Sequence, residues 1–278
     1  MNILEFTLLV GFSSASAGFL GALTGLGGGV VLVPLLTLFF GVDIRYAIGA
    51  SLVSVIATSS GAASAYVKEG YTNLRLGIFL EVATTFGAIA GATIAAYIPT
   101  RVLAVVFGFV LLYSAYLSRR PHSDSVETTP SDTLATRLKL NSTYPTPEGE
   151  KSYTVRAIPA GFSVMFIAGM LSGLLGIGSG AFKVLAMDQF MRIPFKVSTT
   201  TSNFMIGVTA AASAGVYLKR GYIDPGLAMP VMLGVLLGAV LGAKVLVRAR
   251  VEILRTLFSV VILLLAIQMI YNGFTGRI

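Results

Sequence analysis

The chain has 278 residues, 55% of them hydrophobic and only 12% charged, and its formal net charge is +8. Soluble domains carry about 25% charged residues, so this composition indicates a membrane protein, with a length that allows roughly 8 to 10 spans. The sequence has no cysteine, which excludes disulfides and thiolate metal sites, and its one histidine, His122, lies in a polar stretch. We therefore expect no histidine-based metal or catalytic site in the membrane. The basic residues follow the loops between spans and form no nucleic-acid-binding stripe.

The first apolar run extends from Ile3 to Phe40. As one helix it would measure about 57 Å, nearly twice the thickness of the hydrocarbon core. The chain must therefore break, and the glycines of Gly25-Leu26-Gly27-Gly28-Gly29 allow it, because glycine tolerates positive φ. The predicted elements are a helix over 3–24, a tight turn over 25–28 and a short helix over 29–40. At about 18 Å, the short helix suggests a half-helix or re-entrant segment.

The remaining apolar segments predict further helices in both halves of the chain. They cover 47–67, 74–98 and 102–117 in the first half, and 157–175, 181–191, 196–218, 225–247 and 252–272 in the second. The polar segment 118–156 is rich in serine, threonine, proline and charge, and we interpret it as a flexible linker. A spacer is the simpler interpretation, and a regulatory role is the alternative. The predicted domains are a first membrane repeat over 1–117, the linker over 118–156 and a second membrane repeat over 157–278.

The two halves are related by an internal duplication. Residues 18–92 align without a gap with residues 169–243, and 20 of the 75 pairs are identical. The first glycine run thereby returns as Gly176-Ile177-Gly178-Ser179-Gly180. Five apolar segments per half would place the second half upside down in the membrane, whereas counting 3–40 as one crossing would make the halves parallel. The sequence predicts an all-α polytopic membrane protein of about 8–10 transmembrane or re-entrant helices, in two pseudo-symmetric, inverted repeats with glycine-broken helices.

The distribution of basic residues favours the inverted arrangement. With odd crossings, nine basic residues near span ends lie on the side of the linker and five on the side of the termini. By the positive-inside rule, the linker is then cytoplasmic and both termini lie outside. The predicted location is the cell (inner) membrane, as a multi-pass protein.

The glycine breaks are candidate anion sites. A helix that begins at a break leaves its first N–H groups without partners within the helix and carries partial positive charge there. Two such breaks that face each other can form one binding cavity. The candidates are Gly27, Gly28 and Gly29 in the first run, and Gly178, Ser179 and Gly180 in the second. The alternative is that glycine only allows tight helix packing, which we favour for the pairs Gly87–Gly91 and Gly238–Gly242.

Polar and charged side chains within apolar segments complete the candidate site. Six polar residues, 198–203, open the helix predicted over 196–218, and they can cap it or donate hydrogen bonds to a solute. Ser202 and Asn203 lie deeper than the rest, as does Ser51, the repeat equivalent of Ser202, so these three are candidates for ligand contact.

Two embedded charges have alternative roles. Lys183 follows Gly180 by three residues and can neutralise an anion at the break, pair with Asp188 or extend to the interface. Glu81 is a candidate for carrying a coupling proton, and its alternative role is that of a structural partner for a lysine.

At these residues the chain resembles the TauE/SafE family of sulfite exporters. The resemblance rests on the run Gly-Leu-Gly-Gly-Gly-x-x-x-x-Pro-Leu-Leu at 25–36, Ala-Ser-Leu at 50–52, Lys-Glu-Gly-Tyr-Thr-Asn at 68–73, Gly-Ile-Gly-Ser-Gly at 176–180 and Thr-Ser-Asn at 201–203. Membership implies secondary transport of small sulfur-containing anions such as sulfite, sulfoacetate or related organosulfonates, and some members are thought to move other carboxylate or sulfur compounds. Lys183 and Asp188 stand where the first half has Leu32 and Thr37, so the two half-sites differ chemically.

The leading hypothesis is a secondary transporter that exports such an anion by alternating access at a site between the two breaks. The proton gradient or the membrane potential would drive it, because the sequence has no ATP-binding motif. An anion channel of the same fold is the alternative. We expect no enzyme, because no paired carboxylates, histidine cluster or activated nucleophile can be assembled, and no cofactor or metal. The expected partners are the small anionic substrate and the lipid bilayer, without nucleic acid, and a homodimer is left open.

Overall fold

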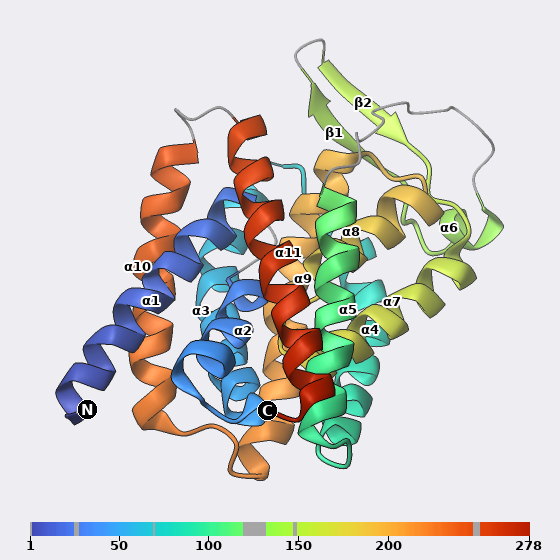
Figure 1. Ribbon diagram of the computed structural model, residues 1–278. Helices are drawn as coiled ribbons and strands as arrows, with labels where there is room; N and C mark the ends of the chain where they lie inside the picture. Colours follow the sequence, from blue (N-terminus) through green and yellow to red (C-terminus); the bar gives the residue numbers. More distant parts are fainter. Residues whose placement is uncertain (1, 25–27, 69, 119–131, 147–148, 247–250) are drawn as a thin grey trace.

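The computed structural model describes residues 2–24, 28–68, 70–118, 132–146, 149–246 and 251–278, and helices dominate it (Figure 1). The first half contains α1 (Ile3–Thr24), α2 (Gly29–Phe40), α3 (Ile44–Lys68), α4 (Leu74–Ala95) and α5 (Thr100–Ser118). The central segment contains α6 (Thr133–Arg137), β1 (Ser142–Thr146) and β2 (Gly149–Tyr153). The second half contains α7 (Ile158–Leu175), α8 (Gly180–Leu185), the π-helix η1 (Ala186–Phe190), α9 (Phe195–Lys219), α10 (Pro225–Leu246) and α11 (Val251–Thr275).

The chain is an all-α polytopic membrane protein, as its composition predicts. Within the described residues, four helices are long and apolar enough to cross a membrane, with spans at Leu4–Gly21, Leu74–Ala95, Ile158–Leu175 and Pro225–Gly242. Large apolar side chains such as Phe12, Phe86 and Leu237 are exposed on these helices. In water such a surface would be costly, whereas lipid tails can cover it.

Both short helices fold back along the long helix that precedes them. Phe40, at the end of α2, contacts Phe6, at the start of α1, with ring centroids 5.9 Å apart. In the second half, the N–H of Arg156 donates to the carbonyl oxygen of Met191, 3.2 Å away, which joins the start of α7 to the end of η1. The segment predicted as one short helix over 181–191 divides into α8 and η1. Neither short helix therefore continues across the bundle, as expected of a re-entrant pair.

Helices of the first half pack against helices of the second. The most extensive contacts join α1 to α10, α4 to α7, α3 to α9 and α5 to α11. A Cβ at Gly87 would overlap the carbonyl oxygen of Phe166, and a Cβ at Gly238 would overlap that of Ala15. These two contacts are related by the 151-residue offset of the duplication. The packing role predicted for this small-residue face is thereby confirmed.

The two ends of the bundle are distinct. Both termini lie at one end, and the β1–β2 hairpin lies at the other (Figure 1). At the end with the termini, Arg45 Nη2 donates to the carbonyl oxygen of Ile98, 2.8 Å away, and the Arg45 guanidinium lies 5.8 Å from the centroid of the Tyr222 ring. The loops after α2, α4 and α9 therefore meet at this end. Which end faces the cytoplasm stays a prediction from the charge distribution.

The central segment 118–156 contains ordered structure that its composition did not predict. Its strands form an antiparallel hairpin in which Ser142 pairs with Tyr153 and Thr146 with Gly149. Short polar strands with few apolar residues give no alternating pattern, which is why the sequence offered no signal. That the segment acts as a flexible linker stays a prediction.

The hairpin is attached to the membrane helices through Asn73. Asn73 Oδ1 accepts from the N–H of Leu76 and caps α4, while Nδ2 donates to Tyr153 Oη, 2.8 Å away, and to the carbonyl oxygen of Leu140, 2.9 Å away. Burial raises the pKa of Tyr153 to about 12, an effect that the hydrogen bond from Asn73 partly opposes. The start of α4 is thus held by the polar segment outside the apolar helices.

Candidate functional site

The two glycine breaks meet inside the bundle. Ser51 in α3 donates a hydrogen bond from Oγ to the carbonyl oxygen of Gly176, 2.8 Å away. A Cβ added to Gly29, the first residue of α2, would lie 2.6 Å from Ser51 Oγ and 2.9 Å from the Gly176 oxygen. Only glycine permits this approach, so the start of α2 lies directly against the break of the other half. Gly27 lies outside the described residues.

The second break is built from left-handed backbone. The φ angle is 68° at Gly176, 72° at Gly178 and 48° at Ser179. The N–H of Gly176 donates to the carbonyl oxygen of Ser172, 2.8 Å away, and ends α7. A serine in this conformation is strained, and the buried Oγ of Ser179 has no hydrogen-bond partner within the described part of the chain. Strain and an unpaired hydroxyl at one residue make Ser179 a strong candidate for ligand contact.

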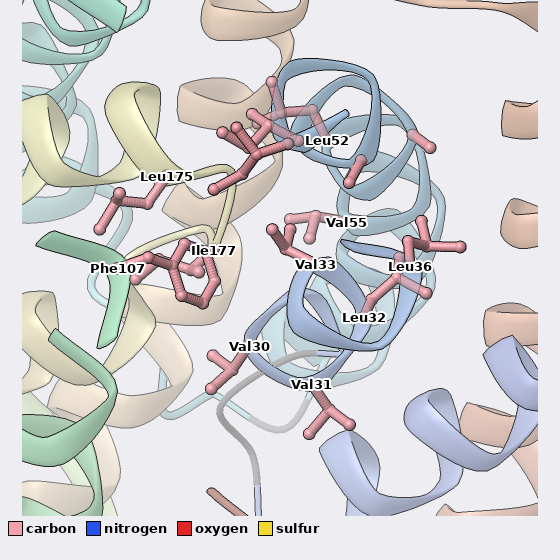
Figure 2. Close-up of a cluster of buried hydrophobic side chains, with 14 of the residues drawn as sticks. Val30, Val31, Leu32, Val33, Leu36, Leu52, Val55, Phe107, Leu175 and Ile177 are labelled. Atoms are coloured by element: carbon pink, nitrogen blue, oxygen red, sulfur yellow. The ribbon is translucent and has the colours of Figure 1, made fainter. Parts of the chain in front are cut away.

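The first break has a different conformation, and its surroundings are apolar. Gly28 is right-handed, with φ −66° and ψ −21°, and its carbonyl oxygen accepts from the N–H of Leu32, 3.0 Å away. Figure 2 shows buried side chains from α2, α3, α5 and the second break in one cluster, among them Val33, Phe107 and Ile177. An anion between the breaks would therefore rely on backbone N–H groups and hydroxyls, because hydrocarbon offers it no partner.

The polar run 198–203 does not cap α9, whose N-cap residue is Pro194 and which has no side-chain cap hydrogen bond. Its hydroxyls bond other segments, including the second break. Ser198 Oγ donates to the carbonyl oxygen of Ile193, and Thr201 Oγ1 accepts from the N–H of Asn73. Ser202 Oγ donates to the carbonyl oxygen of Gly180, 3.2 Å away, which brings it to the second break. Asn203 is half-buried, and the contacts described for the breaks involve its neighbour Ser202 instead.

A buried ion pair joins the two halves beside the second break. Lys183 in α8 has no exposed surface, and its Nζ lies 3.7 Å from Glu81 Oε2 in α4. Lys183 Nζ donates to Thr209 Oγ1 in α9, and Thr209 Oγ1 donates to Glu81 Oε1, 2.7 Å away. Glu81 therefore has the lysine partner that was one of its two alternative roles. Lys183 pairs with Glu81, and its side chain is buried and does not extend to the membrane interface. Two opposite charges at this distance stabilise each other inside an apolar bundle.

This ion pair has no counterpart in the other half. The positions equivalent to Lys183 and Glu81 carry Leu32 and Met232. Thr209 did not enter the predicted site, although Thr58 occupies the equivalent position in the first half. A threonine at the same position of both repeats was a sequence signal that could have singled out Thr209. The sequence does not show which carboxylate Thr209 binds, and the contact between α4 and α9 does.

The site contains no set of residues suited to holding a metal. Among the residues that the structure describes, no group of three or more histidine, cysteine, aspartate or glutamate side chains can hold an ion. What the breaks offer instead is bare backbone and the hydroxyls of Ser51, Ser179 and Ser202, and beside them lies the Lys183 ammonium, which is paired with Glu81 and Thr209 in this conformation. This is chemistry for binding a small anion through hydrogen bonds and one charge.

Comparison with known proteins gives a consistent family assignment. The sequence model of the family described as "Sulfite exporter TauE/SafE" matches residues 9–269. "Probable membrane transporter protein YunE" of Bacillus subtilis (strain 168) is 28% identical over 266 residues, covering 92% of this chain and 94% of that protein. "Probable membrane transporter protein" of Xylella fastidiosa (strain 9a5c) is 25% identical over 282 residues, covering 100% of both chains. No solved structure matches the chain.

Proposed function

Because this chain belongs to the sulfite exporter TauE/SafE family, we propose that it carries a small sulfur-containing anion, such as sulfite or an organosulfonate, out of the cell. The family and the names of its relatives point to a multi-pass membrane transporter rather than an enzyme. The substrate, the direction and the driving force are the parts that we propose.

The contact between the two breaks carries this proposal. Ser51 of the first half bonds Gly176 of the second, and Gly29 lies against both. In this conformation Ser51 and Gly29 lie directly against Gly176, so we expect a bound anion at this point to require that the Ser51–Gly176 hydrogen bond opens. The Ser51 hydroxyl and the N–H groups that begin α2 then become donors for the anion. The unpaired Ser179 hydroxyl supplies a further donor.

The way in which the halves are assembled supports the proposed alternating access. Each re-entrant pair reaches the interior from its own end of the bundle, and each packs against helices of the other half. Movement of one pair relative to the other would expose the central site to one end at a time. We place the linker in the cytoplasm and the termini outside. An inside-negative membrane potential drives an anion outward through the carrier.

An anion channel of the same fold, or a carrier for another small carboxylate or sulfur anion, is the alternative. A channel needs a continuous path, whereas this conformation has the two breaks in direct contact. A carrier binds its anion in every transport cycle and therefore gives saturable flux, which distinguishes it from a channel.

Flux measurements with the purified protein in liposomes test the proposal. Sulfite efflux should saturate with concentration, and sulfoacetate and thiosulfate should compete with it at a shared site. Unitary current steps under voltage clamp would support the channel instead. Efflux equal to that from protein-free liposomes for all three anions would refute transport of this substrate class.

A further inference from the structure

We propose that Glu81 and Lys183 form a proton-operated latch, in which protonation of Glu81 releases Lys183 to bind the transported anion. One proton then moves with each anion, in the same direction. The inference rests on the proposed function and specifies how its driving force is coupled.

The two carboxylate oxygens of Glu81 have different surroundings. Oε1 accepts from Thr209 Oγ1 at 2.7 Å and from Thr85 Oγ1 at 3.3 Å. Oε2 is buried, has no hydrogen-bond partner within the described residues, and faces the Lys183 ammonium at 3.7 Å. A proton can therefore add to Oε2 without displacing a hydrogen bond. The neutral acid no longer attracts the ammonium, so the pair loses its Coulombic attraction.

Thr209 can keep its hydroxyl hydrogen-bonded after Glu81 is protonated and Lys183 is released. Its hydroxyl has a second acceptor, the carbonyl oxygen of Met205, 3.1 Å away. One hydroxyl proton can serve only one of these acceptors fully, so the Thr209 hydroxyl can turn to Met205 when Glu81 becomes neutral. Thr209 is thus a positioning residue, since it bridges Lys183 and Glu81 in one state and is satisfied by its own helix in the other.

Lys183 lies where its released charge reaches the break. The N–H of Lys183 donates to the carbonyl oxygen of Ser179, 3.0 Å away, so the two residues are one helical turn apart on the same face. Side chains on a helix lean toward its N-terminus, which directs the long Lys183 side chain back toward Ser179. The ammonium and the unpaired Ser179 hydroxyl can then contact one anion together.

Other titratable groups near the pair lie farther along their helices. On the elements packed against α4 and α8 they are Arg75 in α4, Arg101, Tyr113 and Tyr116 in α5, Asp188 in η1, and Lys196, Tyr217 and Lys219 in α9. Tyr217 is buried, and its hydroxyl donates to the carbonyl oxygen of Gly173, 3.2 Å away. Arg75, Tyr113, Lys196 and Lys219 are exposed, and Asp188 is half-buried and accepts from Gln189. Arg75 precedes Glu81 by six residues, about 9 Å along the helix. Among the described residues, Lys183 is therefore the charge in contact with Glu81.

The latch is compatible with outward transport. A doubly charged anion that moves with one proton still carries one net negative charge. The inside-negative membrane potential therefore drives this complex outward, whereas a singly charged anion would move without net charge.

Sulfoacetate flux in proteoliposomes tests the latch, because the charge of this probe is constant between about pH 6 and 8. Wild-type efflux should alkalinise the lumen, as reported by a trapped pH dye, and should slow as pH rises, because the latch opens only when Glu81 is protonated. In Glu81→Gln, which mimics the neutral acid, efflux should lose both the proton movement and the pH dependence. Asp224→Asn, which changes an exposed carboxylate in the loop before α10, should behave as wild type.

Sulfoacetate binding to the detergent-solubilised protein is the second measurement, because a variant can bind the anion without transporting it. Glu81→Gln should bind sulfoacetate equally tightly at about pH 6 and 8, and more tightly than the wild type at about pH 8, whereas Lys183→Met should bind at least tenfold more weakly than the wild type at both. Wild-type transport without proton movement, or unchanged pH dependence of binding in Glu81→Gln, would overturn the latch and leave the transport function standing. Absence of any wild-type anion flux would overturn the proposed function as well.

Discussion

The Glu81–Lys183 pair predicts strong energetic coupling between helices of opposite halves. Lys183→Met leaves the Glu81 carboxylate buried without its partner, and Glu81→Gln does the same to the ammonium. Breaking a buried pair from one side costs about 3–5 kcal/mol, because the remaining charge is uncompensated. At the observed 3.7 Å, the attraction between Nζ and Oε2 is on the order of 4 kcal/mol for an effective dielectric constant of about 20.

The double variant Glu81→Gln/Lys183→Met removes both charges and should lose much less than the sum of the single variants. For a chain of this size, 1 kcal/mol corresponds to roughly 2 °C, so each single variant should lower Tm by about 6–10 °C and the double variant by less than about 5 °C. The chain has no tryptophan, so circular dichroism in detergent is the suitable readout.

A matched control and an additivity test complete this experiment. Asp224→Asn keeps the side-chain oxygen that accepts from the N–H of Gly226 at 3.1 Å, so it should change Tm by less than about 1 °C. If the two single effects add in the double variant to within about 0.5 kcal/mol, Glu81 and Lys183 are not coupled and the reasoning from their distance is wrong.

Three further predictions concern backbone, packing and pH. Gly178→Val should abolish sulfite flux while the protein still inserts, because φ is 72° there and a β-branched residue is strained in that region; unchanged flux would contradict this. Gly87→Ala should lower Tm by several degrees, since its Cβ overlaps the main chain of α7, whereas Gly215→Ala has open space and should not; equal shifts would refute the packing role. Because the pKa of Tyr153 is raised from 10.0 to about 12, its contribution to stability is complete below about pH 10 and is lost as pH rises through 12. Thermal melts should show this loss, and Tyr153→Phe should remove that component; an identical alkaline profile in both proteins would contradict it.

The helices and the glycine breaks could be predicted because their signals are local. The apolar run from Ile3 to Phe40 is too long for one span, and α1 and α2 begin and end where the sequence predicts. The same reasoning located the end of α7 at Gly176, where positive φ terminates the helix. Hydropathy and glycine content depend only on residues that are neighbours in the chain, so the helix ends that they predict agree with the structure.

The pairing of side chains across the halves could not be predicted in the same way. Lys183 and Glu81 were both singled out as charges in apolar segments, but the sequence does not show that their two side chains meet. The bridge through Thr209 depends on a third helix, and no spacing in the sequence encodes it. Asn73 is a comparable case, since its partners Tyr153 and Leu140 lie in a polar segment without a periodic pattern.

The most direct test of the central claim asks whether the anion occupies the space between the breaks. Since the chain has no cysteine, Ser179→Cys introduces a single thiol at the second break. A methanethiosulfonate reagent that carries a sulfonate group resembles the substrate and should label this thiol, and sulfoacetate should slow the labelling in proportion to its occupancy. Thr143→Cys, in the exposed hairpin, serves as the control and should react equally fast with and without sulfoacetate. Equal labelling rates of Ser179→Cys with and without sulfoacetate, in a preparation that transports it, would place the site elsewhere.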